Sequence, residues 1–225
     1  MTPIILDMDP GIDDAVALSI ALTNPEIDIK LLTSVAGNVS VDKTTINLLK
    51  LTTFFKQTQV PVARGAAAPL KKAFVDASYI HGASGMPGYE FPTVTTQALP
   101  TDAVSAMAKV LSEAPEPMTI VATGSYTNIA LLIQNHPELI SQIKEFVLMG
   151  GSLSGGNVSS VAEFNIFTDP DAAAVVFKSG IPIVMIGLDV TLKALLSLDT
   201  IDAVANIGEA GNMLHKLMTA YGDSE

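Results

Sequence analysis

Short runs of apolar and β-branched residues alternate with longer stretches of helical period along almost the whole chain. In the longer stretches, apolar side chains recur at the spacing of one helix face. The short runs read PIIL, IKLLTSVAG, VPVARG, MTIVATG, EFVLMGG and IPIVMIGLD. Such alternation is typical of parallel strands joined by crossover helices. It predicts an α/β fold with a Rossmann-like, open, mostly parallel sheet of six strands flanked by helices.

The composition agrees with a sheet that is buried on both faces. Of the 225 residues, 48% are hydrophobic and 16% are charged, which favours a large apolar core. A chain of this length commonly forms one α/β domain, and no internal repeat or linker divides the sequence. We therefore expect a single domain over residues 1–225.

The charge balance and the lack of cysteine exclude several classes of partner. The net charge is −11 and Arg64 is the only arginine, so no basic stripe could neutralise a nucleic-acid backbone. We expect no nucleic-acid partner. Without cysteine, a metal ion must be held by oxygen or by one of the three histidines, which favours a hard cation.

The sequence predicts neither a signal peptide nor a membrane span. Four acids interrupt the N-terminal region where a signal peptide needs an apolar core, and no basic region precedes them. The apolar tract that starts at Ile181 carries Asp189 and Lys193, which makes it a poor membrane span. We expect a cytoplasmic protein with no membrane partner.

Polar and small residues gather where the predicted strands end. They are Asp7 and Asp9, Gly37 and Asn38, Arg64 and Gly65, Thr123 and Gly124, Met149 to Gly151, and Asp189. Ligands of open parallel sheets bind at the carboxyl ends of the strands, so we expect the site at this edge. Between Gly65 and Thr101 the chain has little periodicity and much glycine and proline, which predicts a lid over the crevice.

The segment DMDPGIDD crowds four acids into eight positions, namely Asp7, Asp9, Asp13 and Asp14. Like charges at this separation repel unless a cation lies among them. On an extended segment Asp7 and Asp9 point to the same side, and the Pro-Gly turn brings the next helix start beside them. Capping of that helix explains one or two of the acids. The set as a whole predicts part of a cation site.

The segment ILDMDPGIDDAVAL resembles the N-terminal signature of the calcium-dependent, inosine-uridine preferring nucleoside hydrolases. Further segments resemble that family in order, namely VAGN, HGASG, ATGSYTNIA, VLMGG and NVSSVAEFNIFTDPDAA. The resemblance runs from residue 4 to about residue 190. It implies the nucleoside hydrolase fold and a Ca²⁺ cofactor.

Transferred position by position, the resemblance implies that Asp9, Asp14 and the carbonyl of Thr123 bind Ca²⁺. Oxygen ligands of this kind suit calcium. The resemblance further implies that Asp9 orients and deprotonates the attacking water, that Asp13 contacts the ribose, and that Asp7 supports the site from behind. Threonine at a strand end is also commonly structural, and that interpretation of Thr123 stays open.

The resemblance assigns the sugar to Asn157, Glu163 and Asn165, with Asn38 at the same rim and Met149 on the apolar side of the ribose. Amides and a carboxylate offer the donors and acceptors that several hydroxyls need. Two other interpretations stay open: the polar residues could serve only turns and caps, and Met149 could belong to the core.

The resemblance places His81 near the nucleobase, on a mobile loop, where it could stack on or protonate the base. A solvated loop histidine with no role is the alternative. His136 has no catalytic context.

The resemblance does not extend to the C-terminal third of the family. Family members carry there a His-Asp pair, in which the aspartate binds calcium and the histidine is the proposed acid for the leaving base. Neither His215 nor Asp223 matches that motif. We therefore expect the C-terminal part of the fold to be missing and acid catalysis of base departure to be weaker.

The resemblance implies a ribonucleoside hydrolase that yields ribose and a free base by calcium-assisted water attack at C1′, in a homo-oligomer of two or four chains. One alternative is a non-catalytic remnant that binds calcium or ribose. Another is a phosphatase of the haloacid dehalogenase type, which also has Asp-x-Asp after its first strand. That class needs a lysine and a magnesium-bound phosphate, and the continuation from Pro10 to Asp14 does not fit it.

Overall fold

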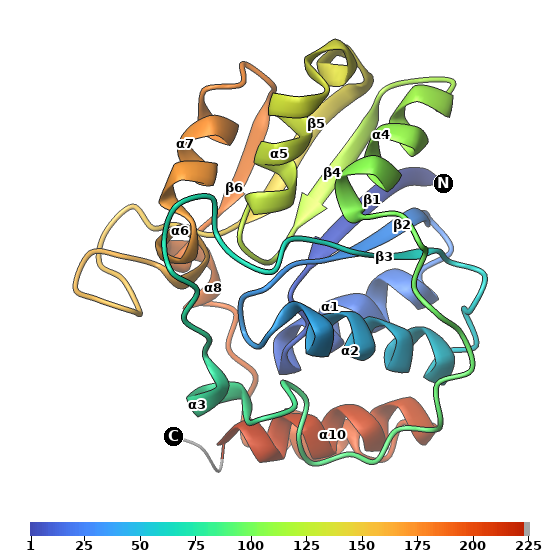
Figure 1. The fold of residues 1–225 in the computed structure, drawn as a ribbon. Helices are drawn as coiled ribbons and strands as arrows, with labels where there is room; N and C mark the ends of the chain where they lie inside the picture. The colour runs from blue at the N-terminus through green and yellow to red at the C-terminus, as the bar shows by residue number, and fades with distance from the viewer. Residues whose placement is uncertain (223–225) are drawn as a thin grey trace.

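The computed structural model of this protein describes residues 1–222 and contains a parallel sheet of six strands (Figure 1). The strands are β1 (Thr2–Met8), β2 (Ile27–Ser34), β3 (Val62–Arg64), β4 (Met118–Ala122), β5 (Ile143–Met149) and β6 (Ile183–Ile186). They follow the order β3-β2-β1-β4-β5-β6, and every neighbouring pair is parallel. The predicted fold class is confirmed, and each of the six predicted strands forms.

Helices cover both faces of the sheet (Figure 1). One face carries α1 (Ile12–Thr23) and α2 (Val41–Phe54), and the other carries α4 (Ala103–Glu113), α5 (Thr127–Asn135) and α7 (Pro170–Phe177). Along β1, Leu6 packs with the α1 side and Ile5 packs with the α4 side. Both sides of the strand are buried because its side chains alternate between two covered faces.

Helix α10 (Gly208–Gly222) packs outside these layers, against α1 (Figure 1). Its Met213 and Leu217 are fully buried in the same apolar cluster as Leu18 of α1. Shorter helical segments fill the remaining connections, namely α3 (Ser78–His81), η1 (Pro137–Gln142), α6 (Phe164–Thr168), α8 (Leu188–Thr191) and α9 (Leu198–Val204). The last turn of α10 reaches the carboxyl edge of the sheet, because the Tyr221 ring lies 5.8 Å from the His81 ring.

The predicted lid has two different halves. Residues 77–81 face the crevice, whereas Tyr89 and Phe91 pack their rings edge-on against Phe54 of α2. The second half of the connection therefore covers α2 rather than the crevice. Helix α4, which follows, was not predicted from the sequence. Its buried residues, namely Ala103, Ala106, Met107, Ala108 and Leu111, recur at helical spacing, so the segment did carry the pattern of a helix.

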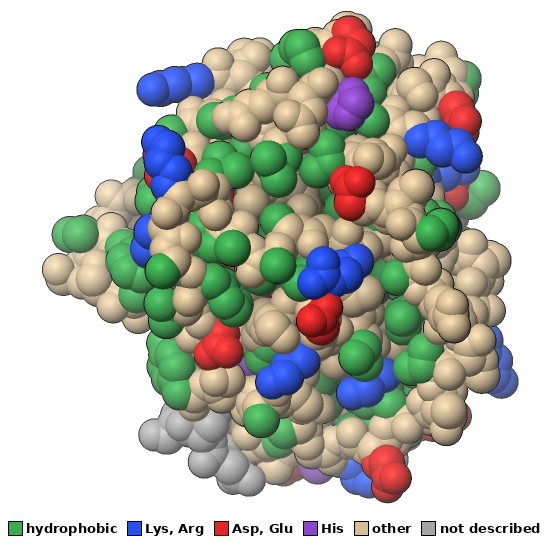
Figure 2. All heavy atoms as spheres, in the orientation of Figure 1, with side chains coloured by type: hydrophobic (Ala, Val, Ile, Leu, Met, Phe, Trp, Pro, Cys, Tyr) green, Lys and Arg blue, Asp and Glu red, His purple; other side chains and the backbone are tan. Residues whose placement is uncertain are grey.

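The surface carries charges of both signs. In the view of Figure 2, basic and acidic side chains are interspersed rather than gathered into a stripe. No helix within residues 1–222 is both long enough and apolar enough to cross a membrane.

Candidate active site

The strand order reverses between β1 and β4, and the predicted cation ligands lie at this point. Asp9 directly follows β1 and Thr123 directly follows β4, and the two strands pair side by side. The carboxyl ends of parallel strands meet at one edge, and a crevice opens where their order reverses. The topology therefore brings together residues that are far apart in the sequence.

Asp9 is the most enclosed acid at the crevice, with 1% of its surface exposed. Its Oδ2 accepts the backbone N–H of Asn38 at 2.8 Å, whereas its Oδ1 has no donor among the described residues. Burial raises the pKa of Asp9 well above the usual range, and the nearby Asp14 carboxyl raises that pKa further. A buried carboxylate oxygen without a donor is costly unless a proton or a cation meets it.

Two glycines leave room for the Asp9 carboxylate. A Cβ added to Gly37 would collide with Asp9 Oδ2, and a Cβ added to Gly124 would lie 2.7 Å from Asp9 Oδ1. The carboxylate is thus enclosed by backbone on two sides. A side chain at either glycine would displace it.

Asp14 lies in the first turn of α1, with 3% of its surface exposed. Its Oδ2 accepts the Gly11 N–H at 3.0 Å and so caps the helix. Its Oδ1 accepts the hydroxyl of Thr123 at 2.6 Å. Burial, and secondarily Asp13, raises the pKa of Asp14 to about 7. The capping interpretation is correct for Asp14, yet the helix uses only one of its two oxygens.

Asp7 lies inside β1, not after it as the sequence predicted, and it is fully buried. The strand continues to Met8 because Asp7 finds partners within the sheet. Its Oδ1 accepts the Thr33 hydroxyl at 2.5 Å and the Asn128 amide at 2.8 Å. Burial raises the pKa of Asp7 to about 7.

A cleft of about 490 Å³ opens at this edge of the sheet. It gathers all the predicted site residues except the buried Asp9, namely Asp13, Asp14, Asn38, His81, Thr123, Met149, Asn157, Glu163 and Asn165. These residues lie at the ends of five strands, β1 to β5, or in the segments that follow them. The sequence thus identified residues that share one cleft.

The polar residues of α6 form one wall of the cleft. Glu163 caps α6 by accepting the N–H groups of Asn165 and Ile166, and it also accepts the N–H of Gly151 at 2.8 Å. Asn165 donates through Nδ2 to the carbonyl of Thr123 at 2.8 Å. Among the described residues, the Asn165 side chain bonds through Nδ2, so its Oδ1 can accept a hydrogen bond from a ligand. The interpretation that this segment caps a helix is therefore confirmed for Glu163.

His81 lines the same cleft and is 8% exposed. The alternative interpretation, a solvated loop histidine, is therefore wrong. Its Nδ1 has no hydrogen-bond partner among the described residues, and burial lowers its pKa. The sequence did not identify several other residues that line the cleft, namely Tyr79, Ile80, Phe164, Leu188 and Tyr221. Neighbouring motifs could have indicated Tyr79 and Phe164, whereas nothing in the sequence indicated Tyr221.

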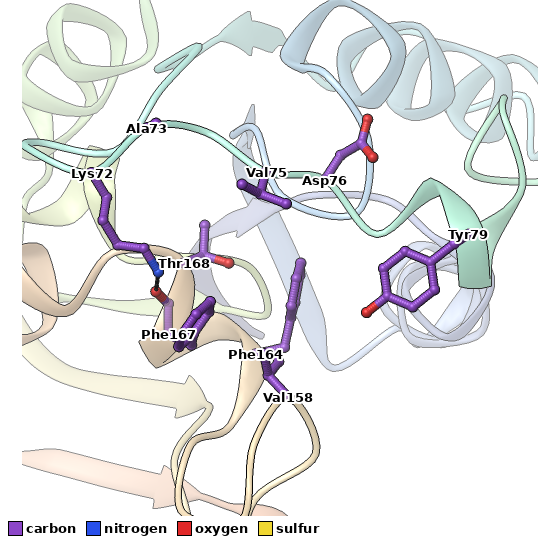
Figure 3. Close-up of a pocket in the computed structure, with 9 residues that line it drawn as sticks. All are labelled: Lys72, Ala73, Val75, Asp76, Tyr79, Val158, Phe164, Phe167 and Thr168. Atoms are coloured by element: carbon purple, nitrogen blue, oxygen red, sulfur yellow. Dashed lines mark hydrogen bonds between the residues drawn. The ribbon is translucent and has the colours of Figure 1, made fainter.

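A smaller hollow of about 60 Å³ lies beside the cleft, between α6 and the loop that precedes α3 (Figure 3). Phe164, Val158 and Tyr79 line both spaces. Lys72 closes the hollow at one side, where its Nζ donates to the Phe167 carbonyl (Figure 3). The hollow extends the apolar side of the cleft.

The donor set suits a hard cation that binds oxygen. Within residues 1–222, no three histidine, aspartate or glutamate side chains come together as a metal cage. This edge of the sheet instead brings together the carboxylates of Asp9 and Asp14 and the peptide carbonyl of Thr123, and Asp9 Oδ1 has no donor among the described residues. Mixed carboxylate and carbonyl ligands are typical of calcium. These residues therefore fit the implied cation.

Fold and site together define a class of protein, a Rossmann-like α/β protein with its crevice where the strand order reverses. The crevice combines buried carboxylates with amide groups, which suits a ligand with several hydroxyls. The chain belongs to the inosine-uridine preferring nucleoside hydrolase family, whose model matches residues 4–225. The family resemblance inferred from the motifs is confirmed.

Individual relatives agree with this assignment. The chain is 54% identical to the non-specific ribonucleoside hydrolase RihC of Salmonella agona, over 97% of this chain and 71% of the relative. The purine-preferring ribonucleoside hydrolase of Gardnerella vaginalis superposes with a TM-score of 0.94 at 34% identity, covering 99% of this chain and 72% of that one. The plant nucleoside hydrolase PpNRh1 gives a TM-score of 0.92 at 31% identity, covering 99% and 71%.

His215 is not among the residues that line the cleft. It lies on α10, where its Nε2 is 3.3 Å from Asp202 Oδ1 of α9. Asp223 lies outside the described residues. The prediction that His215 does not take the family role agrees with its position.

Proposed function

We propose that this chain hydrolyses the N-glycosidic bond of ribonucleosides and releases ribose and a free base. The observation that carries the proposal is the buried Asp9 Oδ1, which lacks a donor at the switch point of a nucleoside hydrolase fold. Asp14 and Thr123, joined by a 2.6 Å hydrogen bond, lie at the same point.

We propose that Asp9, Asp14 and the Thr123 carbonyl hold calcium. When bound, Ca²⁺ would neutralise the two carboxylates and polarise a water molecule and the ribose hydroxyls. The high pKa of Asp9 and Asp14 supports this role, because buried acids gain most from a counter-charge.

Asp9 is the general base in this proposal. Its Oδ2 is fixed by the Asn38 N–H, so Oδ1 is left to accept the proton of the attacking water. Water then attacks C1′ as the C1′–N bond breaks, through a transition state with oxocarbenium character. The base leaves with the electron pair of that bond and takes a proton from solvent to become the free base. The negative charges around the cleft stabilise that developing positive charge.

The sugar is held by Asp13, Asn38, Asn157, Glu163 and Asn165, with Met149 against its apolar side. Hydrogen-bonding groups of both kinds support this assignment, and cationic side chains are absent from the cleft lining among the described residues. His81, next to Tyr221, contacts the base. A neutral ribonucleoside is therefore the proposed substrate.

Release of reducing sugar from inosine, uridine, cytidine and adenosine, with added calcium or with a chelator, tests the proposal. Asp9→Asn should abolish release, because the isosteric amide cannot accept a proton. Asp28→Asn is the matched control, because Asp28 lies at the opposite edge of the sheet, paired with Lys30 at 2.6 Å.

Calcium-dependent release by the wild type, lost only in Asp9→Asn, supports the hydrolase. Nucleoside binding without release would favour the non-catalytic alternative. Release that is indifferent to calcium and to Asp9 would refute the proposed site. Phosphatase activity with magnesium would instead indicate the haloacid dehalogenase alternative.

We also propose that the chain forms a homo-oligomer. Exposed apolar side chains on the last strand and after it support this, since Val184 of β6 is 48% exposed and Leu195, which follows α8, is 80% exposed. Apolar side chains exposed to solvent can be covered in protein interfaces. Light scattering after size-exclusion chromatography tests whether the particle has the mass of two or four chains.

A further inference from the structure

Two side chains converge on one backbone carbonyl behind the cleft. The hydroxyl of Tyr126 donates to the Met149 carbonyl at 3.0 Å. The amide Nδ2 of Asn165 lies 3.2 Å from the same oxygen. Met149 and Asn165 line the cleft, whereas Tyr126 is fully buried. Tyr126 thus touches the cleft only through its neighbours.

The side-chain amide of Asn165 lies near more hydrogen-bond acceptors than it has N–H groups to offer. Its amide carries two N–H groups, and it faces the Thr123 carbonyl at 2.8 Å, the Met149 carbonyl at 3.2 Å and the Met149 Sδ at 3.2 Å. The hydroxyl of Tyr126 supplies the shorter bond to the Met149 carbonyl. Because that carbonyl already has a donor, Asn165 can stay close to Thr123.

The surroundings fix the position of the Tyr126 hydroxyl. Tyr126 caps α5 and its ring lies 6.4 Å from the Phe177 ring. A Cβ on Gly150 would collide with the hydroxyl and would lie 3.3 Å from Glu163 Oε2. The absence of a side chain at Gly150 therefore leaves room for the Tyr126 hydroxyl beside Met149 and Glu163. Burial raises the pKa of Tyr126, so the hydroxyl remains a donor.

We infer that Tyr126 is a positioning residue for the hydrolysis: by bonding the Met149 carbonyl, it holds Asn165 between the Thr123 carbonyl and the ribose. This inference rests on the proposed function for its link to catalysis. The contact itself does not depend on turnover.

Loss of the hydroxyl should act through Asn165. In Tyr126→Phe the half-buried Met149 carbonyl keeps only the more distant amide of Asn165 as a donor among the described residues, and losing its shorter hydrogen bond is costly. The Asn165 amide should then move toward Met149 and away from Thr123. We expect KM for inosine and uridine to rise by about fivefold to tenfold, the size of one lost hydrogen bond, with a smaller change in kcat.

The experiment compares Tyr126→Phe with Thr52→Val in the full chain. Thr52 is also 1% exposed or less, and its hydroxyl bonds only to backbone carbonyls of its own helix α2. Three quantities are measured for each variant: KM and kcat with calcium, the melting temperature, and the side-chain amide NMR signals of Asn165. Loss of signals in Asn165→Asp assigns those amide signals.

The inference predicts that the Asn165 signals move and KM rises in Tyr126→Phe, while Thr52→Val changes neither. The melting temperature should fall by a similar amount in the two variants. Unmoved Asn165 signals, or a KM that stays within about twofold while kcat is also unchanged, would overturn the inference. A wild-type chain that releases no ribose would defeat the proposed function instead. The amide signals distinguish the two failures, because they report on Asn165 without turnover.

Discussion

The hydroxyl of Thr123 donates to Asp14 Oδ1 at 2.6 Å, across 109 positions of sequence. This bond ties the end of β4 to the first turn of α1. It also aligns the Thr123 peptide, whose carbonyl accepts the Asn165 amide at 2.8 Å. One threonine therefore contributes a hydroxyl to the buried acid and a carbonyl to the crevice.

Thr123→Val should weaken calcium binding. The hydroxyl lowers the pKa of Asp14 from the value that burial alone would give, so its loss favours the protonated acid, which binds no cation. We expect the apparent Kd for calcium near neutral pH to rise by about threefold to tenfold, the size of one hydrogen bond to a charged group. Calorimetric titration with calcium measures it.

Thr119→Val is the control for that experiment. Thr119 lies on β4, the strand that Thr123 follows; it is buried and its hydroxyl donates to Glu145 at 3.2 Å, away from the cleft. Its loss should leave the calcium Kd unchanged. If both variants weaken calcium binding equally, the Thr123 hydroxyl has no specific role.

The cation-free protein should lose stability as pH rises from acid to neutral. Burial raises the pKa of Asp7 and of Asp14 to about 7, from 3.8. Between those values the folded state binds more protons than the unfolded state. The free energy of unfolding therefore falls with rising pH over this window, by up to about 1.4 kcal/mol per pH unit for each acid. Urea unfolding in the presence of a chelator measures this slope.

Calcium should reverse that trend. The cation binds the ionised carboxylates, so its stabilising effect should be larger at about pH 8 than at about pH 5. The same urea titrations with saturating calcium provide the comparison. A calcium effect that does not depend on pH would argue against carboxylate ligands.

The sequence predicted the strands and the location of the acids for related reasons. β-branched runs mark buried strands, and the strand ends of a parallel sheet share one edge, so Asp9, Asn38 and Thr123 had to converge if the topology was right. The inward position of Asp7 was missed. It depends on Thr33 of β2 and Asn128 of α5 as partners, and a local sequence pattern does not reveal contacts between distant elements.

Long-range packing accounts for the other omissions. Tyr221 reaches the cleft only because α10 docks on α1, and Tyr126 meets Met149 only because β4 and β5 are neighbours. Tyr126 belongs to the motif ATGSYTNIA, but no local pattern indicates the contact that either tyrosine makes. The buried residues of α4 do recur at helical spacing, so its periodicity could have predicted this helix.

Asn128→Ala should destabilise the fold by about 3 kcal/mol. The fully buried amide donates to Asp7 Oδ1 and to the Ser34 carbonyl and accepts the N–H of Ala66. Its removal leaves buried polar groups without partners, each costing about 1–3 kcal/mol. Urea unfolding measures the loss. Asn135→Ala, at the exposed end of the same helix, should change stability by less than about 0.5 kcal/mol.

Gly37→Ala should abolish hydrolysis while leaving the chain folded. The new Cβ would collide with Asp9 Oδ2, and the carboxylate must then turn away from the Asn38 N–H that fixes it. A misplaced base and cation ligand should lower kcat/KM by about 100-fold or more. Gly180→Ala is the control, because its Cβ would meet no atom within 4 Å and only a positive φ of 78° opposes it. Ribose release measures the activity of both variants, and far-ultraviolet circular dichroism measures whether they are folded. Equal activity in the two would show that the Asp9 carboxylate does not need its present position.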